Sequence, residues 1–322
     1  MIPKELDYQR IKEIYEKLTP YIKKTPILHA SKCMKKIFNT NLFLKLEFFQ
    51  YSGTFKARGA INNILNLSDI QKKLGVTAVS AGNHAIATSF AANKFGIKNK
   101  VFMYKSANPF KINCVKSYNA NVIFSNPKEA FMNVEKISKE NGYTIIHPFD
   151  GINTIQGTAC LGYEISNQIK ELDNIIISVG GGGLISGVGS IIRQKFPNCK
   201  IIGVEPEGAC GLTESLEKGQ PITDVKINTI ADSLSPPFHL PFSFSICKKV
   251  IDKMILVSDI EMKKAMKFMF NNFKFVLEPA CVAGIAALLG PLKNKFQNEK
   301  TLILLCGSNI DMKSWVNFTD NS

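Results

Sequence analysis

The chain has 322 residues, 45% of them hydrophobic, so it can bury the core of one large domain or two smaller ones. Its eight scattered cysteines form no Cys-x-x-Cys pair that would indicate zinc or a disulfide framework. No stretch approaches the roughly 20 apolar residues that span a bilayer, and the N-terminus has no apolar signal core, so we expect a cytoplasmic protein without membrane contact. The net charge of +14 comes from dispersed lysines with only three arginines, which argues against a nucleic-acid-binding surface.

Short runs of β-branched and aromatic residues alternate with helical patterns along the chain. Helical apolar spacing occurs, for example, at Phe131, Val134 and Ile137. Such alternation predicts an α/β fold with mostly parallel, twisted sheets that helices cover on both faces. A strand as apolar as 175–179 is typical of a sheet buried on both sides. The predicted strands cover residues 42–46, 76–79, 101–104, 122–124, 144–146, 175–179, 201–204 and 302–305.

The four strand–helix alternations within residues 76–147 form a compact group. We therefore predict two domains, a small one over 76–147 and a large one made of 1–75 and 148–322. No internal repeat or low-complexity linker marks the boundary.

Lys56 lies in the segment Tyr-Ser-Gly-Thr-Phe-Lys-Ala-Arg-Gly, between the predicted strand 42–46 and a helical run over 57–65. Gly53 and Gly59 allow close backbone approach, and Phe55 can lie flat against an aromatic ring. An amine desolvated at such a position has a lowered pKa, as a lysine that forms a Schiff base requires. A lone lysine is more often a solvated surface charge, so this interpretation depends on the other motifs.

Four consecutive glycines, Gly180, Gly181, Gly182 and Gly183, follow the predicted strand 175–179 and precede a helical run that begins at Leu184. Unhindered backbone N–H groups at such a junction can converge on a phosphate, and the helix dipole adds roughly 0.3–1 kcal/mol. The segment matches neither Gly-x-Gly-x-x-Gly nor a Walker motif. We interpret it as a phosphate-binding loop rather than a flexible turn.

A third segment, Ser80, Ala81, Gly82, Asn83 and His84, again lies between a predicted strand and a helix. Its small residues leave backbone N–H groups free at the helix N-terminus, which suits a carboxylate. The Asn83 amide could bond a ring hydroxyl. His84 by itself is more typical of a structural hydrogen-bonding residue than of a catalyst.

The last predicted strand ends in Cys306-Gly-Ser-Asn, where a thiol beside a pyridine nitrogen would leave that nitrogen neutral or weakly hydrogen-bonded. Together these motifs resemble the fold-type II pyridoxal-phosphate enzymes, specifically the serine/threonine dehydratase and serine racemase family, whose fold is like that of the tryptophan synthase β subunit. The matching segments occur in family order over about residues 20–312, and they are 47–60, 80–84, 180–183, 277–280 and 306–309.

The resemblance implies a site for pyridoxal 5′-phosphate. Lys56 would carry the cofactor as a Schiff base and shuttle the α-proton, Phe55 would pack on the ring, and Asn83 would bond its 3′-oxygen. The four glycines and Leu184 would hold the phosphate, Cys306 would face the pyridine nitrogen, and Glu278 would lie near the cofactor. The loop from Ser80 to His84 would grip the substrate carboxylate.

Ala81 separates two activities within this family. Racemization needs an acid or base on each face of a planar carbanion, and the racemases carry a serine immediately before Gly-Asn-His. Ala81 stands there in this chain and cannot donate a proton. The substitution predicts elimination of the β-hydroxyl group instead.

Three segments depart from the family pattern, and one of them is the run Gln156-Gly157-Thr158, which lies further from Glu164 than that pattern suggests. Relatives often bind a divalent cation through a glutamate, a backbone carbonyl and an aspartate. Glu205 and the Ala209 carbonyl are kept here, but the aspartate position is Gly211. A cation would therefore need substitute ligands such as water. The usual Ala-Asp-Gly reads Ala-Asp-Ser, so the Ser233 hydroxyl could narrow or repolarise the pocket. The following Pro-Pro-Phe-His-Leu-Pro, residues 236–241, could shape a pocket for a different β-hydroxy amino acid.

We therefore expect a homodimeric enzyme that dehydrates and deaminates L-threonine or L-serine to a 2-oxo acid and ammonia. Two alternatives stay open: a dehydratase or racemase of another β-hydroxy amino acid, such as hydroxyaspartate, phenylserine or serine, and a basic nucleic-acid-binding protein. The chain ends 16 residues after Cys306, so we do not expect a C-terminal regulatory domain.

Overall fold

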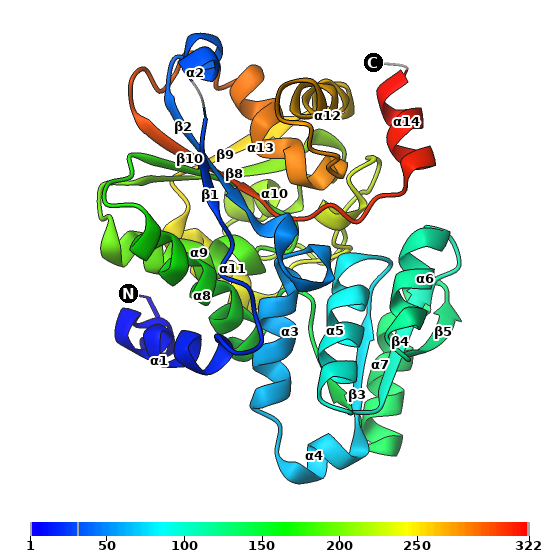
Figure 1. The fold of residues 1–322 in the computed structure, drawn as a ribbon. Helices are drawn as coiled ribbons and strands as arrows, with labels where there is room; N and C mark the ends of the chain where they lie inside the picture. Colours follow the sequence, from blue (N-terminus) through cyan, green and yellow to red (C-terminus); the bar gives the residue numbers. More distant parts are fainter. Residues whose placement is uncertain (1, 31, 321–322) are drawn as a thin grey trace.

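The computed structural model describes residues 2–30 and 32–320. These residues form two sheets that are covered by helices (Figure 1). The larger sheet has six strands in the order β1-β2-β10-β7-β8-β9, and the smaller has four in the order β5-β4-β3-β6. Every described strand pair is parallel except β1 with β2. The predicted α/β class with mostly parallel sheets is confirmed.

The central strands are nearly continuous apolar runs because helices cover both faces of each sheet. The strands of the larger sheet are β1 (Ile27–His29), β2 (Asn41–Leu46), β7 (Asn174–Ser178), β8 (Lys200–Pro206), β9 (Lys253–Val257) and β10 (Lys300–Leu305). Those of the smaller sheet are β3 (Val76–Val79), β4 (Asn99–Tyr104), β5 (Asn121–Ser125) and β6 (Thr144–Ile145).

The helices form layers on the sheets. They are α1 (Tyr8–Leu18), α2 (Lys32–Phe38), α3 (Lys56–Leu65), α4 (Asp69–Leu74), α5 (Asn83–Lys94), α6 (Pro109–Ser117), α7 (Pro127–Asn141), α8 (Ile152–Gln168), α9 (Gly183–Lys195), α10 (Gly211–Lys218), α11 (Pro241–Val250), α12 (Asp259–Phe273), α13 (Pro279–Leu289) and α14 (Met312–Asp320). Helices α12 and α13 cover one face of the larger sheet, and α8, α9 and α11 cover the other (Figure 1). Helix α3 packs against both α8 and α5, so it joins the helical layers of the two sheets.

Each of the eight predicted strands is present, with its ends displaced by at most two residues. Strands β1 and β9 were not predicted. Both lie at edges of the larger sheet: β1 has three residues, none of them fully buried, and β9 begins with an exposed lysine and mixes exposed with buried positions. A partly exposed edge strand lacks the continuous apolar run that marks a central one.

The strands of the smaller sheet all fall between residues 76 and 145, whereas those of the larger sheet end before residue 47 or begin after residue 173. On this basis we propose the domain division already predicted, with 76–147 as the small domain and 1–75 with 148–322 as the large one. No helix among the described residues is both long and apolar enough to cross a membrane.

Strands β2, β10 and β7 are adjacent and parallel, so the segments that follow Leu46, Leu305 and Ser178 meet at one edge of the larger sheet. The segment that follows Val79 leaves the corresponding edge of the smaller sheet. Open α/β sheets bind ligands at these carboxyl ends. The topology thus collects the four motif segments from distant parts of the sequence.

Candidate active site

Lys56 is the first residue of α3, and its side chain lines a cavity between the two sheets. Its Nζ donates a hydrogen bond to the Pro148 carbonyl oxygen at 2.5 Å and lies 5.1 Å from the centroid of the Phe55 ring. Burial lowers the pKa of Lys56 to about 8, and a smaller electrostatic effect of Cys306 opposes this decrease. An amine that reaches the cavity and is largely desolvated is suited to act as a neutral nucleophile.

The segment before Lys56 is bonded to the segment after β10. Phe55 N donates to the Cys306 carbonyl oxygen at 3.0 Å, and Ser308 N donates to the Gly53 carbonyl oxygen at 3.0 Å. The Cys306 side chain is buried and lines the same cavity as Phe55 and Lys56. Residues more than 250 positions apart in sequence are thereby fixed side by side.

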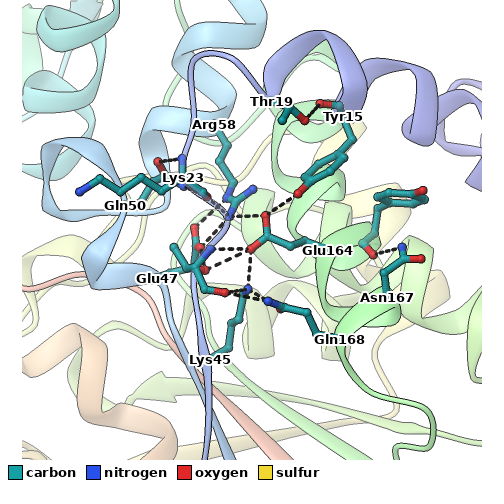
Figure 2. Close-up of polar contacts among 12 residues, drawn as sticks. Tyr15, Thr19, Lys23, Lys45, Glu47, Gln50, Arg58, Glu164, Asn167 and Gln168 are labelled. Carbon is teal, nitrogen blue, oxygen red and sulfur yellow. Dashed lines mark hydrogen bonds and ion pairs between the residues drawn. The ribbon is translucent and has the colours of Figure 1, made fainter.

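A buried cluster of four charges holds the beginning of α3 in place (Figure 2). Arg58 donates from Nε and Nη2 to the two carboxylate oxygens of Glu47, both at 2.8 Å, and from Nη2 to Glu164 at 3.1 Å. Lys45 Nζ donates to the other Glu164 oxygen at 2.6 Å. All four side chains are fully buried and their charges balance. The cluster joins β2, α3 and α8 directly behind Lys56.

Gly180, Gly181 and Gly182 lie in the turn between β7 and α9, and Gly183 is the first residue of α9. A Cβ on Gly181 would lie 2.1 Å from Phe149 Cγ, and a Cβ on Gly183 would lie 2.4 Å from the Phe149 carbonyl oxygen, so any side chain at either position would displace Phe149. The first N–H groups of α9 have no acceptor within the helix. The buried Ser178 hydroxyl, which lines the same cavity, has no hydrogen-bond partner in the part of the chain that the structure describes. This polar cradle fits a phosphate group.

The loop from Ser80 to Gly82 leads into α5, whose first residue is Asn83. Asn83 Nδ2 donates to Glu278 at 2.5 Å and to the Ser233 hydroxyl at 3.1 Å, and its Oδ1 accepts from Asn309 Nδ2 at 2.7 Å. The side chain therefore already links three segments around the cavity.

His84 lies on the next position of α5, and its Nε2 is 2.8 Å from the Ile146 carbonyl oxygen. Burial, with a further effect of the Lys56 charge, lowers the pKa of His84 to about 3. A neutral imidazole bonded to the backbone agrees with the structural role that is typical of a lone histidine.

Lys111 was not anticipated from the sequence. It projects from α6 with 4% exposure, and its Nζ lies 2.6 Å from Asp232 Oδ2 and 3.6 Å from Glu278 Oε2. Burial disfavours its charge, but Asp232 and Glu278 outweigh burial and raise the pKa of Lys111. Burial also disfavours the charged form of Glu278 and so raises its pKa, and the positive charge of Lys111 opposes that rise. Lys111 is one of many lysines in the chain, and nothing in its local sequence distinguishes it as a site residue.

Two adjoining cavities meet at Lys56, Asn83, Phe149, Gly181 and Ser233. The first is completed by Phe55, Ser178, Gly180, Gly182, Gly183, Leu184, Leu234, Ala280 and Cys306. The second is completed by Val79, Ser80, Ala81, Gly82, His84, Tyr104, Phe131, Pro148, Asp232, Ser235, Pro236 and Pro237. The predicted cofactor-binding residues other than Glu278 thus line the first cavity, and the predicted substrate loop lines the second.

The second cavity has an apolar wall that the sequence did not reveal. Tyr104 comes from β4 of the smaller sheet and Phe131 from helix α7. Phe149, Pro236 and Pro237 come from loops outside that sheet. The ring of Phe238 lies 4.8 Å from that of Phe131 and 6.3 Å from that of Phe149, centroid to centroid. The helical spacing of Phe131, Val134 and Ile137 predicts a helix, and all three lie on α7 and pack in one hydrophobic cluster. Phe131 also borders the cavity.

The residues predicted to hold a divalent cation do not fit one. Glu205 is fully buried at the end of β8, and its carboxylate already accepts hydrogen bonds from Leu212 N and Thr213 N. Ala209 follows in a short 3₁₀ turn, and Gly211 supplies no side-chain oxygen. Within residues 2–30 and 32–320, no group of three His, Cys, Asp or Glu side chains could hold a metal ion.

A lysine amine beside a phosphate cradle, between the carboxyl ends of two parallel sheets, defines an enzyme that binds a phosphorylated aldehyde cofactor. The chain matches the model of the family described as pyridoxal-phosphate dependent enzyme over residues 18–307, and it belongs to that family. The predicted cofactor, pyridoxal 5′-phosphate, and the resemblance to the fold-type II serine/threonine dehydratases are thereby confirmed.

Similar proteins narrow the class. The chain is 40% identical to phenylserine dehydratase from Ralstonia pickettii over 306 residues, which cover 95% of this chain and 94% of that protein. It is 36% identical to the catabolic L-threonine dehydratase of Staphylococcus aureus over 307 residues, 94% of this chain and 88% of that one. The structure of maize serine racemase superposes with a TM-score of 0.91 at 32% identity, covering 97% of this chain and 96% of that chain. The protein is therefore an enzyme of the pyridoxal-phosphate-dependent dehydratase and racemase family.

Proposed function

We propose that the enzyme dehydrates and deaminates a β-hydroxy-α-amino acid with an aryl group on the β-carbon, such as phenylserine, to a 2-oxo acid and ammonia. The observation that carries this choice is the aromatic wall of the second cavity, which Phe131, Phe149 and Tyr104 provide. Packing a phenyl ring there in place of a methyl group should favour the larger substrate by about 2 kcal/mol, or ~30-fold. The likeness to phenylserine dehydratase supports the same choice.

The side chains around the cavities have distinct roles in this proposal. The glycine turn and the Ser178 hydroxyl would bind the cofactor phosphate, and Asn83 and Cys306 would border its ring. Bound pyridoxal phosphate supplies an electron sink that acidifies the C–H bond at the α-carbon. Lys56 lines both cavities, and its Nζ would take that proton.

The remaining steps follow from the loop residues. The N–H groups at the start of α5 would bind the substrate carboxylate. Ala81 lines the same cavity without a proton donor, so the proposal assigns loss of the β-hydroxyl group rather than return of the proton to the opposite face. The net reaction releases one water and consumes one when the product hydrolyses to the 2-oxo acid and ammonia.

L-threonine and L-serine form the second candidate substrate class. Three hydroxyl groups, on Ser80, Ser233 and Ser235, line the same cavity and suit a small polar substrate. The likeness to the threonine dehydratase supports this reading.

A substrate panel tests the proposal. The purified holoenzyme is incubated with L-threo-phenylserine, L-threonine, L-serine and threo-3-hydroxyaspartate, and the 2-oxo acid formed is measured. We expect kcat/KM for phenylserine to exceed that for threonine at least ~10-fold. Turnover of threonine or serine without turnover of phenylserine would refute the aryl preference, and D-amino acid as the main product would refute elimination.

We also propose that the enzyme works as a cytoplasmic homodimer. The family resemblance supports the dimer, and the seven described cysteines, all free, suit a reducing compartment. Light scattering behind size exclusion should give twice 35.7 kDa, and a mass of one chain would contradict the dimer.

A further inference from the structure

Glu205 is the residue that the family resemblance assigns to a divalent cation in this chain. It lies at the end of β8, is fully buried, and was predicted to bind a divalent cation with the Ala209 carbonyl and an aspartate at position 211. Gly211 stands at that position, so one of the three expected ligands is missing. A buried carboxylate nevertheless needs a compensating partner.

The beginning of α10 supplies that partner. Leu212 N donates to Glu205 Oε1 at 2.8 Å, and Thr213 N and the Thr213 hydroxyl donate to Oε2 at 2.9 and 2.7 Å. The two amides belong to the first turn of a helix that starts at Gly211, where the helix dipole is positive. Three donors aimed at the carboxylate oppose the approach of a cation to the same oxygens.

The space that an aspartate would need is also filled. A Cβ on Gly211 would lie 2.7 Å from His239 Nε2 and 2.6 Å from Val225 Cγ2. His239 has 2% exposure, and neither ring nitrogen has a hydrogen-bond partner among the residues that the structure describes. Burial lowers the pKa of His239 to about 4, so the imidazole is uncharged near neutral pH and occupies volume without supplying a positive charge.

We propose that the first turn of α10, with the Thr213 hydroxyl, replaces the divalent cation as the permanent partner of Glu205, so this enzyme folds and holds its cofactor without a divalent cation. Gly211 and His239 are coupled parts of the replacement, because the glycine leaves room for the imidazole and the imidazole excludes an aspartate.

The first experiment compares the holoenzyme before and after dialysis against EDTA. Metal content is measured by mass spectrometry, and Tm is measured with and without 1 mM Mg²⁺, Ca²⁺, Mn²⁺ or Zn²⁺. We expect less than about 0.1 metal ion per chain and Tm shifts below about 1 °C, because a ligand that binds only the folded state would raise Tm. A bound equivalent of metal, or a rise of several degrees with any of these ions, overturns the proposal.

The second experiment removes one donor. Thr213→Val deletes the hydroxyl at nearly constant volume, and Thr213→Ser is the matched control that keeps it. We expect the valine variant to melt several degrees below the wild type, equally with and without EDTA, and the serine variant to melt close to it. Equal Tm values for all three proteins, or recovery of Thr213→Val by a divalent cation, would contradict the assigned role of α10.

Discussion

Arg58 Nη2 and Glu164 Oε2 lie 3.1 Å apart, with both side chains fully buried. The contact joins α3 to α8 two residues after Lys56. It belongs to a cluster with Glu47 and Lys45 in which two positive and two negative charges balance (Figure 2). Because each charge is buried and paired with an opposite charge on a neighbouring segment, we infer that the cluster fixes the position of α3, and with it the direction of the Lys56 amine.

Glu164→Gln should destabilise the protein by about 3–5 kcal/mol, because it leaves two buried cations with one anion. The free energy of unfolding is measured by urea titration. Glu13→Gln is the control, since Glu13 pairs with Arg10 at the surface and its loss should change stability by less than ~0.5 kcal/mol. A loss below about 1 kcal/mol for Glu164→Gln would show that the cluster is not essential to the fold.

Cofactor loading should depend on pH through Lys56. Burial lowers the pKa of its amine from 10.5 to about 8, so at pH 7.5 about a quarter of the molecules carry the neutral amine that attacks an aldehyde. The rate at which cofactor-free enzyme gains its Schiff-base absorbance should therefore rise with pH up to about 8 and then level off. A rate that still increases tenfold per unit between pH 9 and 10 would indicate a lysine with an ordinary pKa. Lys56→Ala should never gain the band.

The aromatic wall can be tested at Phe131. Phe131→Ser should lower kcat/KM for phenylserine ~10-fold or more and change that for threonine less than ~3-fold, because only the aryl group contacts the removed ring. Phe124→Ser is a matched control, since Phe124 lies on β5 with 45% exposure and lines neither cavity of the site. Equal losses for both substrates would assign Phe131 to folding rather than to specificity.

Ala81→Ser should add a second proton donor to the cavity that Lys56 lines. We expect the ratio of D-serine to pyruvate formed from L-serine to increase ~10-fold or more, since general acid catalysis typically contributes 10²–10⁴-fold. Chiral chromatography of the reaction mixture measures this ratio. Ala81→Gly, which changes the loop without adding a hydroxyl, should leave the ratio unchanged; a similar rise in that variant would mean that loop flexibility, not the hydroxyl, controls the outcome.

Much of the fold was determined by local pattern. The run Ile175-Ile-Ile-Ser-Val predicted a strand buried on both faces, and all of β7 is buried. The phosphate cradle was also predictable, because its four glycines are contiguous and follow that strand directly. A contiguous motif can be recognised in the sequence because the residues that form the site are already neighbours along the chain, so no tertiary contact is needed to bring them together.

The tertiary structure alone decided which buried side chains face a cavity and which charges meet. The sequence placed Phe131 on an apolar helix face, but only the packing of α7 beside residues 236–238 makes it part of a binding wall. Glu205 was predicted as a metal ligand from its motif. Whether it can bind a metal depends on His239, 34 positions away, and on where α10 begins. Apolar spacing predicts that a side chain is buried. It does not predict which groups the side chain contacts, because those contacts depend on loops and sheets that meet only in the folded chain.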